Sequence, residues 1–269
     1  MDIDRMRELY DRDQRQDLAI PGMRREVVGT IVRHVNLAGG EGMIIYSRLA
    51  AEHVAAAIDE QTGYFAAIGQ DFEWKVYRHD TPPDLKDRLG AHGFEIGADE
   101  AILVLDLATA PDLLAQTPPP TIRRITDPAG VPDAISVQNV VWQEDFGWLE
   151  QRLTTNLRER PDYLSIYVVY EDDTPVASAW INFPQQSQFA SLWGGSTLPE
   201  YRKRGIYTGL LAARAQEARQ RGRRFLTVDA SPMSRPILLT LGFQLISYAY
   251  PCVWHVDRSD RRDDRGVLP

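Results

Sequence analysis

Apolar residues in the second half of the chain recur at the spacings of strands and helices. Residues 205–222 carry two apolar rows at helical spacing, one starting at Ile206 and the other at Tyr207, and Gly222 is suited to end this helix. Residues 189–197 form a strand-like run that contains Gly194 and Gly195, where we expect a β-bulge. The pattern therefore predicts a strand, a loop and a long helix in this order.

The other segments of the second half alternate in the same way. Further strands are predicted at residues 121–125, twice within 163–184 around an acidic turn, at 224–231 and at 243–256. Helices are predicted from near Pro132, over 146–159 and, as a short helix, over 234–242. This mixture predicts the α/β class, with a mixed α+β sheet.

The first half repeats part of this order. Strands are predicted at residues 43–49, 72–77 and 101–107, with helices over 50–69 and 82–94 between them. The short helix of each half ends in Gly-Phe, at Gly93–Phe94 and at Gly242–Phe243. We interpret this as an internal repeat of strand–helix–strand–helix–strand.

A proline-rich segment separates the two halves. Residues 111–120 read PDLLAQTPPP, and three consecutive prolines cannot join a helix or a central strand. We therefore expect a linker at 111–120 between domains at 1–110 and 121–257. Residues 258–269 are of mixed charge with almost nothing to bury, so we expect a disordered tail.

Composition narrows the class of protein. The chain has 269 residues, 43% of them apolar, which suits two domains with cores of their own. The net charge of −8 argues against nucleic-acid binding, and no apolar run approaches a membrane span. The charged N-terminus lacks an apolar signal region, and a single cysteine, Cys252, suits a reducing compartment, so we expect a cytoplasmic protein.

One basic cluster stands out against this acidic background. Arg202, Lys203 and Arg204 precede Gly205, directly before the long helix. Cations are unfavourable at a helix N-terminus, which already carries partial positive charge. The arrangement is explained if an anion such as a phosphate binds to the exposed N–H groups.

At these residues the chain resembles the GNAT superfamily of acyl-CoA-dependent N-acyltransferases. The superfamily's signature is Arg/Gln-x-x-Gly-x-Gly/Ala, and here residues 202–207 read RKRGIY. A preceding strand, the entry PEYR, the apolar helix and a downstream Leu-Gly-Phe also agree, so the resemblance covers roughly residues 121–256. It implies tandem GNAT-like folds, the second complete and the first a partial, degenerate unit without a cofactor loop. Tyr207 departs from the signature, because a small residue is usual there.

The resemblance implies acetyl-CoA as co-substrate. The strand before the loop would pair with the pantetheine arm, the loop would hold the pyrophosphate, and two serines after the next strand would meet the cofactor. We expect Tyr207 to pack outward or to donate its hydroxyl. The cofactor-binding residues implied in this way are Ser196, Thr197, Leu198, Arg202, Lys203, Arg204, Gly205, Ile206, Tyr207, Thr208, Ser231 and Ser234.

Acyl transfer to an amine needs a base, oxyanion donors and a proton for the leaving thiolate. The tyrosine that often supplies this proton is replaced here by Leu238, which leaves Tyr248, Tyr250 or Tyr207 as substitutes. Residues 189–195 contain no acid, so Asp229 and Glu144 become the candidate bases. Packing tyrosines, a capping role for Asp229 and a solvated face for Glu144 are the alternative interpretations.

No metal site is expected, because the five histidines show no ligand spacing. Trp148 or Trp193 could line an acceptor pocket, although tryptophans are more often core residues. The predicted function is an acetyl-CoA-dependent N-acetyltransferase in which a small, cationic primary amine attacks the thioester directly in a ternary complex. The alternatives are an acyl-CoA-binding sensor or a scaffold that has lost catalysis, and the degenerate half could form a homodimer interface.

Overall fold

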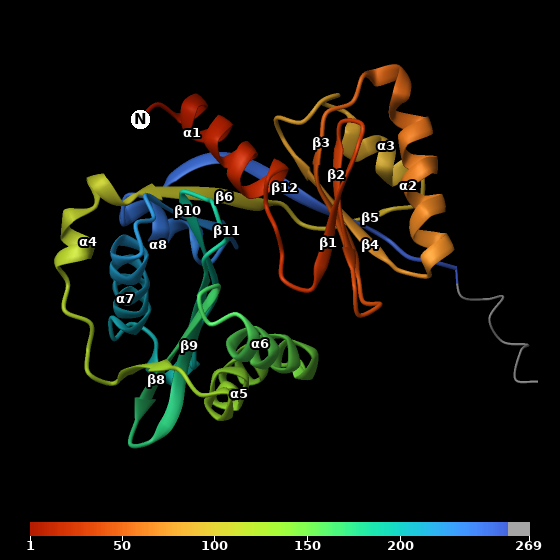
Figure 1. Cartoon of the computed structure of the whole chain (residues 1–269). Helices are drawn as coiled ribbons and strands as arrows, with labels where there is room; N and C mark the ends of the chain where they lie inside the picture. Colours follow the sequence, from red (N-terminus) through yellow and green to blue (C-terminus); the bar gives the residue numbers. More distant parts are fainter. Residues whose placement is uncertain (258–269) are drawn as a thin grey trace, which may run out of the picture. The chain divides into compact units, whose positions relative to one another are not determined.

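The computed structural model describes residues 1–257 as two compact units (Figure 1). We call the first the loop unit, because it contains the basic loop; it consists of Met1–Gln14 and Ala101–Ile246. The companion unit consists of Arg15–Glu100 and the described residues from Ser247 onward. The expected disordered tail at 258–269 lies outside the described residues. Within residues 1–257, no helix is long and apolar enough to cross a membrane.

The loop unit is built on a mixed sheet. Neighbouring strands pair antiparallel except for one parallel pair, β10 with β11. The strands lie in the order β6 (Glu100–Asp106), β11 (Phe225–Ala230), β10 (Phe189–Thr197), β9 (Thr174–Asn182), β8 (Leu164–Glu171) and β7 (Ile122–Ile125).

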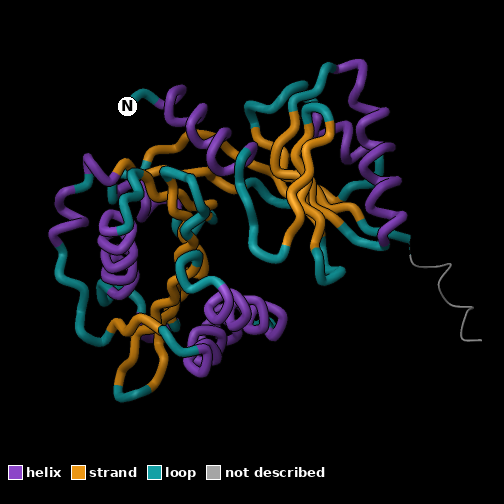
Figure 2. The backbone as a smooth tube through the Cα atoms, viewed as in Figure 1, coloured by secondary structure: helices purple, strands orange, loops and turns teal. Residues whose placement is uncertain are grey.

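Helices cover both faces of this sheet (Figure 2). Strand β8 shows why, because Ile166 and Val168 point into an apolar cluster with α5 (Val131–Trp142) and α6 (Gly147–Glu159). The alternate residue Tyr167 donates its hydroxyl to Glu217 on the opposite side, at 2.7 Å. Both faces of β8 are buried, which explains its nearly continuous apolar sequence. The remaining helices of this unit are α1 (Ile3–Tyr10), α4 (Pro111–Ala115), α7 (Ile206–Gln220) and α8 (Arg235–Thr240).

The companion unit has a similar strand plan with one antiparallel strand fewer. Its first three strands are antiparallel, the third runs parallel to the fourth, and the fourth pairs antiparallel with the C-terminal half of β12. A core around Trp74 and Phe65 lies beneath its two helices. The elements are β1 (Met23–Val28), β2 (Ile31–Asn36), β3 (Gly42–Ser47), α2 (Val54–Ile68), β4 (Phe72–Tyr77), α3 (Leu85–Ala91), β5 (Glu95–Ile96) and β12 (Gln244–Trp254).

The two Gly-Phe pairs are equivalent structurally. Gly93 and Gly242 both have positive φ, at 86° and 91°, and each ends a short helix. The N–H of the phenylalanine that follows donates a hydrogen bond to the carbonyl oxygen of a buried leucine in the helix. Phe94 N donates to Leu89 O at 3.2 Å, and Phe243 N donates to Leu238 O at 3.1 Å. This is a Schellman cap, in which glycine supplies the left-handed residue. The predicted internal repeat therefore has the same local geometry in both units.

The domain boundary at 111–120 is not where the compact units divide. Strand β6, which we expected to close the first half, pairs with β11 of the loop unit over Ala101–Asp106. The end of β12 pairs in turn with β4 of the companion unit. Each half of the sequence thus contributes its last strand to the sheet of the other unit.

The N-terminal segment also belongs to the loop unit rather than to the first half. Met6, Leu9 and Tyr10 of α1 are buried, and the Tyr10 ring meets Phe189 edge-on at 5.8 Å. The side-chain amide of Gln14 donates to Ser187 Oγ at 2.7 Å. The amphipathic face of α1 needs an apolar surface, and β10 supplies part of it.

The segment of the expected linker packs against α7. Its first residues form α4, and Gln216 of α7 donates to the carbonyl oxygens of Leu114 and Gln116, at 3.0 and 2.6 Å. Pro119 lies beside Gly209, 3.1 Å from where a Cβ would stand. The prolines exclude regular structure, as predicted, but the segment still finds partners on α7.

Candidate functional site

Strands β10 and β11 separate in the middle of the sheet. They pair at only three positions, Phe189 to Ser191 with Phe225 to Thr227. Beyond these positions β11 continues to pair with β6, and β10 continues to pair with β9. The edge of β10 from Leu192 onward therefore has no strand partner on the β11 side, which leaves a slot that an extended group can enter.

The predicted bulge lies at this point. The β10–β9 register shifts between Trp193 and Ser196, so Gly194 and Gly195 are unpaired. Gly194 has φ of 59°, and a Cβ there would stand 1.8 Å from the Trp180 ring. Glycine is thus required both by the backbone conformation and by the ring that covers it.

From the α5 side, Gln138 fixes the bulge. Its amide nitrogen donates to Gly194 O at 2.7 Å and to Ser178 Oγ at 2.8 Å. Its amide oxygen accepts from Ser196 Oγ at 3.0 Å, and the Trp142 indole donates to the same hydroxyl at 3.1 Å. A buried amide with several bonds of normal length holds the bulge in one conformation.

From the α7 side, Arg214 reaches the same region. Its guanidinium donates to Trp180 O at 3.2 Å, and it contacts Trp193 O at 3.4 Å. The residue is 2% exposed and has no carboxylate partner among residues 1–257. Burial lowers the pKa of Arg214 to about 10. The bulge therefore has a positive charge beneath it.

The basic loop leads into an uncapped helix. Gly205 is the N-cap of α7, with φ of 77°, and no side chain caps this end. The first hydrogen bond of the helix runs from Gly209 N to Gly205 O at 2.9 Å. The N–H groups of Ile206, Tyr207 and Thr208 come before it, so they have no acceptor within the helix. Lys203 also has positive φ, at 62°, which is unusual outside glycine and recurs at ligand sites.

The cations of the loop are exposed, but two of them are braced. Arg202 Nε donates to Thr197 O at 3.0 Å, and Arg204 Nη2 donates to Glu200 O at 3.0 Å. Neither forms an ion pair with a carboxylate of the described chain, and Lys203 is solvent-exposed. The loop therefore presents unneutralised positive charge and free N–H groups together, which is the chemistry of an anion site.

Tyr207 faces the bulge in β10, and whether it packs away from the phosphate or donates its hydroxyl stays a prediction. Its ring is half-buried and lies 3.2 Å from the position of a Cβ on Gly195, because the first turn of α7 faces the sheet. Burial raises the pKa of Tyr207, and the nearby Arg214 opposes that effect. The usual small residue is thus replaced by a tyrosine that reaches the bulge.

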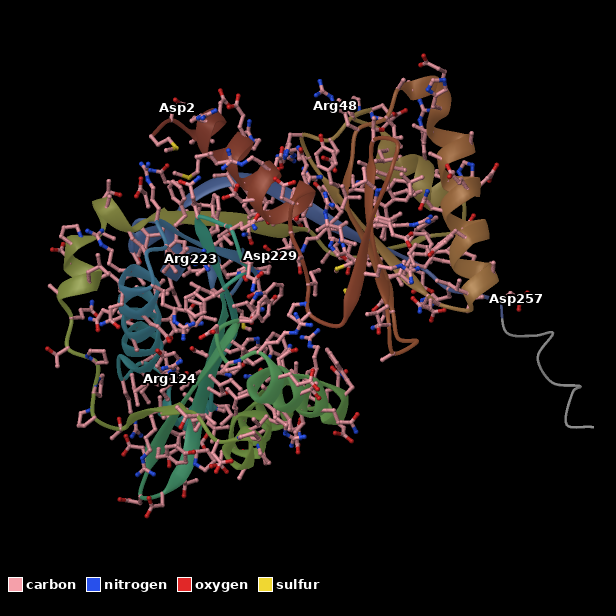
Figure 3. All side chains as sticks on the ribbon, in the orientation of Figure 1. Asp2, Arg48, Arg124, Arg223, Asp229 and Asp257 are labelled. Atoms are coloured by element: carbon pink, nitrogen blue, oxygen red, sulfur yellow. The ribbon has the colours of Figure 1, made fainter. Side chains whose placement is uncertain are left out.

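Asp229 lies on the other wall of the slot. It sits on β11 two residues beyond Thr227, the last position paired with β10, and it pairs with Ile102 of β6 (Figure 3). The N-cap position of α8 is Ser234, and the alternative capping role of Asp229 stays a prediction. Ser231 and Ser234 form a turn before that helix, with their hydroxyls 3.3 Å apart.

The other candidates lie elsewhere. Tyr248 and Tyr250 belong to the companion unit, where Arg78 and Lys86 stack on their rings at 4.9 and 4.8 Å. Glu144 is exposed in the connection between α5 and α6. Leu238 is fully buried, so the position of the usual acid is filled by core packing. No cluster of metal ligands occurs within residues 1–257.

Two residues at the bulge were not predicted from the sequence. Gln138 and Arg214 are the side chains that bond the bulge, from α5 and from α7. The signal was present in Arg214, a charged residue on the apolar side of a predicted amphipathic helix. Gln138 gave no comparable signal, because a glutamine in a helix is ordinary.

A splayed parallel strand pair beside a basic loop and an uncapped helix N-terminus agrees with the arrangement that the resemblance to the GNAT superfamily implied. Residues 132–243 match the model of the acetyltransferase (GNAT) family, and this part of the chain is a GNAT domain. No curated protein matches the sequence significantly.

Solved structures of this fold extend over most of the chain. A GCN5-related N-acetyltransferase from Kribbella flavida is 16% identical with a TM-score of 0.63, and the match covers 93% of each chain. A conserved protein of unknown function from Staphylococcus epidermidis ATCC 12228 is 15% identical with a TM-score of 0.66, over 90% of this chain and 97% of the other. A tandem GNAT protein from the clavulanic acid biosynthesis pathway is 13% identical with a TM-score of 0.59, over 90% and 86%. The fold is therefore that of tandem GNAT-like units.

Proposed function

We propose that the loop unit transfers an acetyl group from acetyl-CoA to the primary amine of a small, cationic acceptor. One observation carries the proposal: the unpaired edge of β10 leads directly to the uncapped, basic N-terminus of α7. An extended arm that ends in a pyrophosphate is complementary to both features. The GNAT domain at residues 132–243 supports acyl transfer in general.

The residues present fit such a co-substrate. N–H groups of residues 203–208 would surround the pyrophosphate, and Arg202 and Arg204 would offset its charge. Apart from its chain neighbours, no atom lies within 4 Å of the point where a Cβ on Gly205 would stand, so the protein does not fill the space beside this glycine. Residues 196–198 would pair with the pantetheine arm as an added strand, because their partners on β9 occupy only the opposite edge.

The reacting end would lie at the bulge. We assign proton donation toward the leaving thiolate to Tyr207, the tyrosine whose ring contacts Gly195. Asp229 on the opposite wall is the candidate base that keeps the amine neutral. Cys252 is fully buried in the companion unit, and burial raises its pKa to about 12, so the proposal gives it no role as a covalent nucleophile. We therefore propose direct attack in a ternary complex. Tyr248 and Tyr250 stay predictions.

The acceptor side is acidic and aromatic. Glu144 and Asp145 lie in the connection between α5 and α6, and the exposed Trp148 follows them. The Arg152 guanidinium already stacks on the Trp148 ring at 5.0 Å, so this ring accepts a cation on its face. These features support a cationic amine as the acceptor.

Thermal unfolding with and without acetyl-CoA tests the co-substrate. At about a hundred times its dissociation constant, a ligand adds roughly 2.7 kcal/mol of stability. We expect this gain in the parent and its loss in the Gly205→Val, Arg204→Glu double variant. Thiol release with a panel of primary amines then tests transfer.

A second candidate function is an acyl-CoA sensor without catalysis. It is favoured by one observation, the fully buried Leu238 at the position of the usual acid. Stabilisation by acetyl-CoA without thiol release for any amine would support the sensor. Turnover with any amine would exclude it.

A further inference from the structure

A second group of arginines lies at the other end of α7, in its last turn and directly after it. Residues 219–224 read RQRGRR, and four of these six residues are arginines in a chain whose net charge is −8. Figure 3 marks Arg223 beyond the end of this helix. Acyl transfer at the bulge makes no use of this segment.

These arginines border a hollow of about 220 Å³. Its walls come from the end of α7, from the connection between α7 and β11 and from the short helical turn after β6 (Leu107–Thr109). The residues that line it are Ala108, Arg219, Gly222, Arg223 and Arg224.

Only part of the positive charge is neutralised. Arg224 pairs with Asp106 at 3.0 Å, and Arg221 pairs with Glu217 at 2.8 Å. Arg219 and Arg223 have no carboxylate partner within the described chain; they contact the carbonyl oxygens of Leu107 and Ser187 instead. The hollow therefore carries excess positive charge.

One donor in this group is buried and unused. Arg223 Nε is shielded from solvent and has no hydrogen-bond partner among the described residues. Burial and the neighbouring Arg221 lower the pKa of Arg223. A buried N–H without an acceptor is costly.

The favourable helix dipole explains only part of the cluster. A basic residue in the last turn is stabilised by the partial negative charge there, which accounts for Arg219 and equally for Arg158 at the end of α6. Arg223 and Arg224 follow the helix end. The last-turn carbonyls already accept backbone bonds, Gly222 N to Arg219 O at 3.0 Å and Arg223 N to Ala218 O at 2.9 Å.

We propose that this hollow is an anion site that binds the phosphoryl group of a small metabolite, separate from the basic loop at the opposite end of α7. Guanidinium groups match the geometry of phosphate oxygens, and several of them can bind one phosphoryl group. The volume is below that of pockets for drug-sized ligands, so the phosphoryl group enters and the remainder of the ligand stays outside. Occupancy would join the end of α7 to the turn after β6.

A phosphate titration of the full chain tests the site. Thermal unfolding is followed with inorganic phosphate, and sodium chloride keeps the ionic strength constant. We expect saturable stabilisation by phosphate in the parent protein. Arg219→Gln should raise the apparent dissociation constant at least about tenfold, because one charge-assisted pair is lost.

Two variants locate the binding. Arg158→Gln removes an arginine from the last turn of α6 and should leave the phosphate response unchanged. Arg204→Gln weakens phosphate binding at the basic loop, so the saturable response that remains in this variant should come from the hollow and should be lost when Arg219→Gln is added. Arg219 is exposed and makes one long hydrogen-bond contact, so we expect Arg219→Gln to fold as the parent does. Arg223→Gln is a second test, and its thermal midpoint without phosphate shows whether the variant is folded.

The possible outcomes separate the explanations. Phosphate and chloride acting alike would overturn the proposal. Loss of the phosphate response in Arg204→Gln but not in Arg219→Gln would place the anion at the basic loop and would also overturn it. Loss in Arg219→Gln alone would support it.

Discussion

Gln138 approaches the β10 bulge as a single side chain that satisfies three partners. We predict that Gln138→Met lowers the free energy of unfolding by about 1–3 kcal/mol, because Gly194 O and two buried hydroxyls lose a partner. The rate of thiol release should fall with it, since the bulge would no longer be held in one conformation. Urea unfolding and steady-state kinetics measure the two effects.

The matched control is Gln151→Met on the exposed side of α6, which should change neither quantity. A Gln138→Met protein with parental stability and parental kinetics would show that the bulge does not need this amide.

Tyr170 gives a prediction for alkaline pH. Its hydroxyl donates to Asp133 at 2.7 Å, and burial together with this bond raises its pKa to about 12. The unfolded value is near 10, so the folded state holds the proton longer. This contribution to stability is complete below about pH 10 and is lost as the pH rises toward 12.

In Tyr170→Phe the free energy of unfolding should therefore be lower by roughly 1 kcal/mol at pH 8. The difference from the parent should shrink by pH 11. Urea midpoints at the two pH values measure it, with Tyr201→Phe as the control. A difference that does not change with pH would contradict the assignment.

Single residues differ in how far the sequence revealed them. The basic loop could be predicted because three cations before a helix conflict with its dipole, and such a conflict needs an explanation. The direction of Tyr207 could not be predicted, because it depends on the rotation of α7 against the sheet. Whether Asp229 acts as the base stays a prediction.

The bulge is an element that depends on glycine. Gly194→Ala would place a Cβ 1.8 Å from the Trp180 ring at a backbone φ of 59°, so the ring or the strand must move. We predict a loss of at least about 2–3 kcal/mol, from overpacking and backbone strain together, and a loss of thiol release.

Gly63→Ala in α2 is the opposite case. No atom lies within 4 Å of its Cβ position, and the residue is inside a helix, so the change should stabilise by about 0.5–1 kcal/mol. Chemical denaturation compares both variants. Equal effects at the two glycines would mean that the bulge is not shaped by Trp180.

Elements with a clear period were predictable. The helix over 205–222 and the bulge in the strand before the loop are confirmed by α7 and by the register shift in β10. The hairpin of β1 and β2 was missed. Strand β1, MRREVV, has three charged residues, and Arg33 and His34 interrupt the apolar residues of β2, IVRHVN, so neither shows the apolar alternation that identifies a strand.

At the scale of the whole molecule, the units could not be read from the order of the sequence. Strand β6 follows α3 in the chain yet pairs with β11, and β12 follows α8 yet ends beside β4. The sequence of an apolar strand such as AILVLDL does not indicate which other strand it pairs with. A repeat in sequence therefore predicted two similar units but assigned their last strands to the wrong sheets.

This exchange predicts that residues 121–246, close to the expected second domain, do not form a stable fold alone. The fragment lacks β6, so Phe225–Ala230 lose the backbone hydrogen bonds to that strand. It also lacks the buried side chains of Met6, Leu9 and Tyr10 of α1. Three buried side chains at about 1.5–3 kcal/mol each approach the whole stability of a typical domain, which is about 5–15 kcal/mol. Circular dichroism during urea unfolding should show no cooperative transition in the fragment and a clear one in the full chain.

A fragment that carries residues 1–14 and 101–246, joined by a short flexible linker, should regain the transition. Cooperative unfolding of 121–246 at the parental midpoint would mean that the exchanged strand and the N-terminal helix are dispensable.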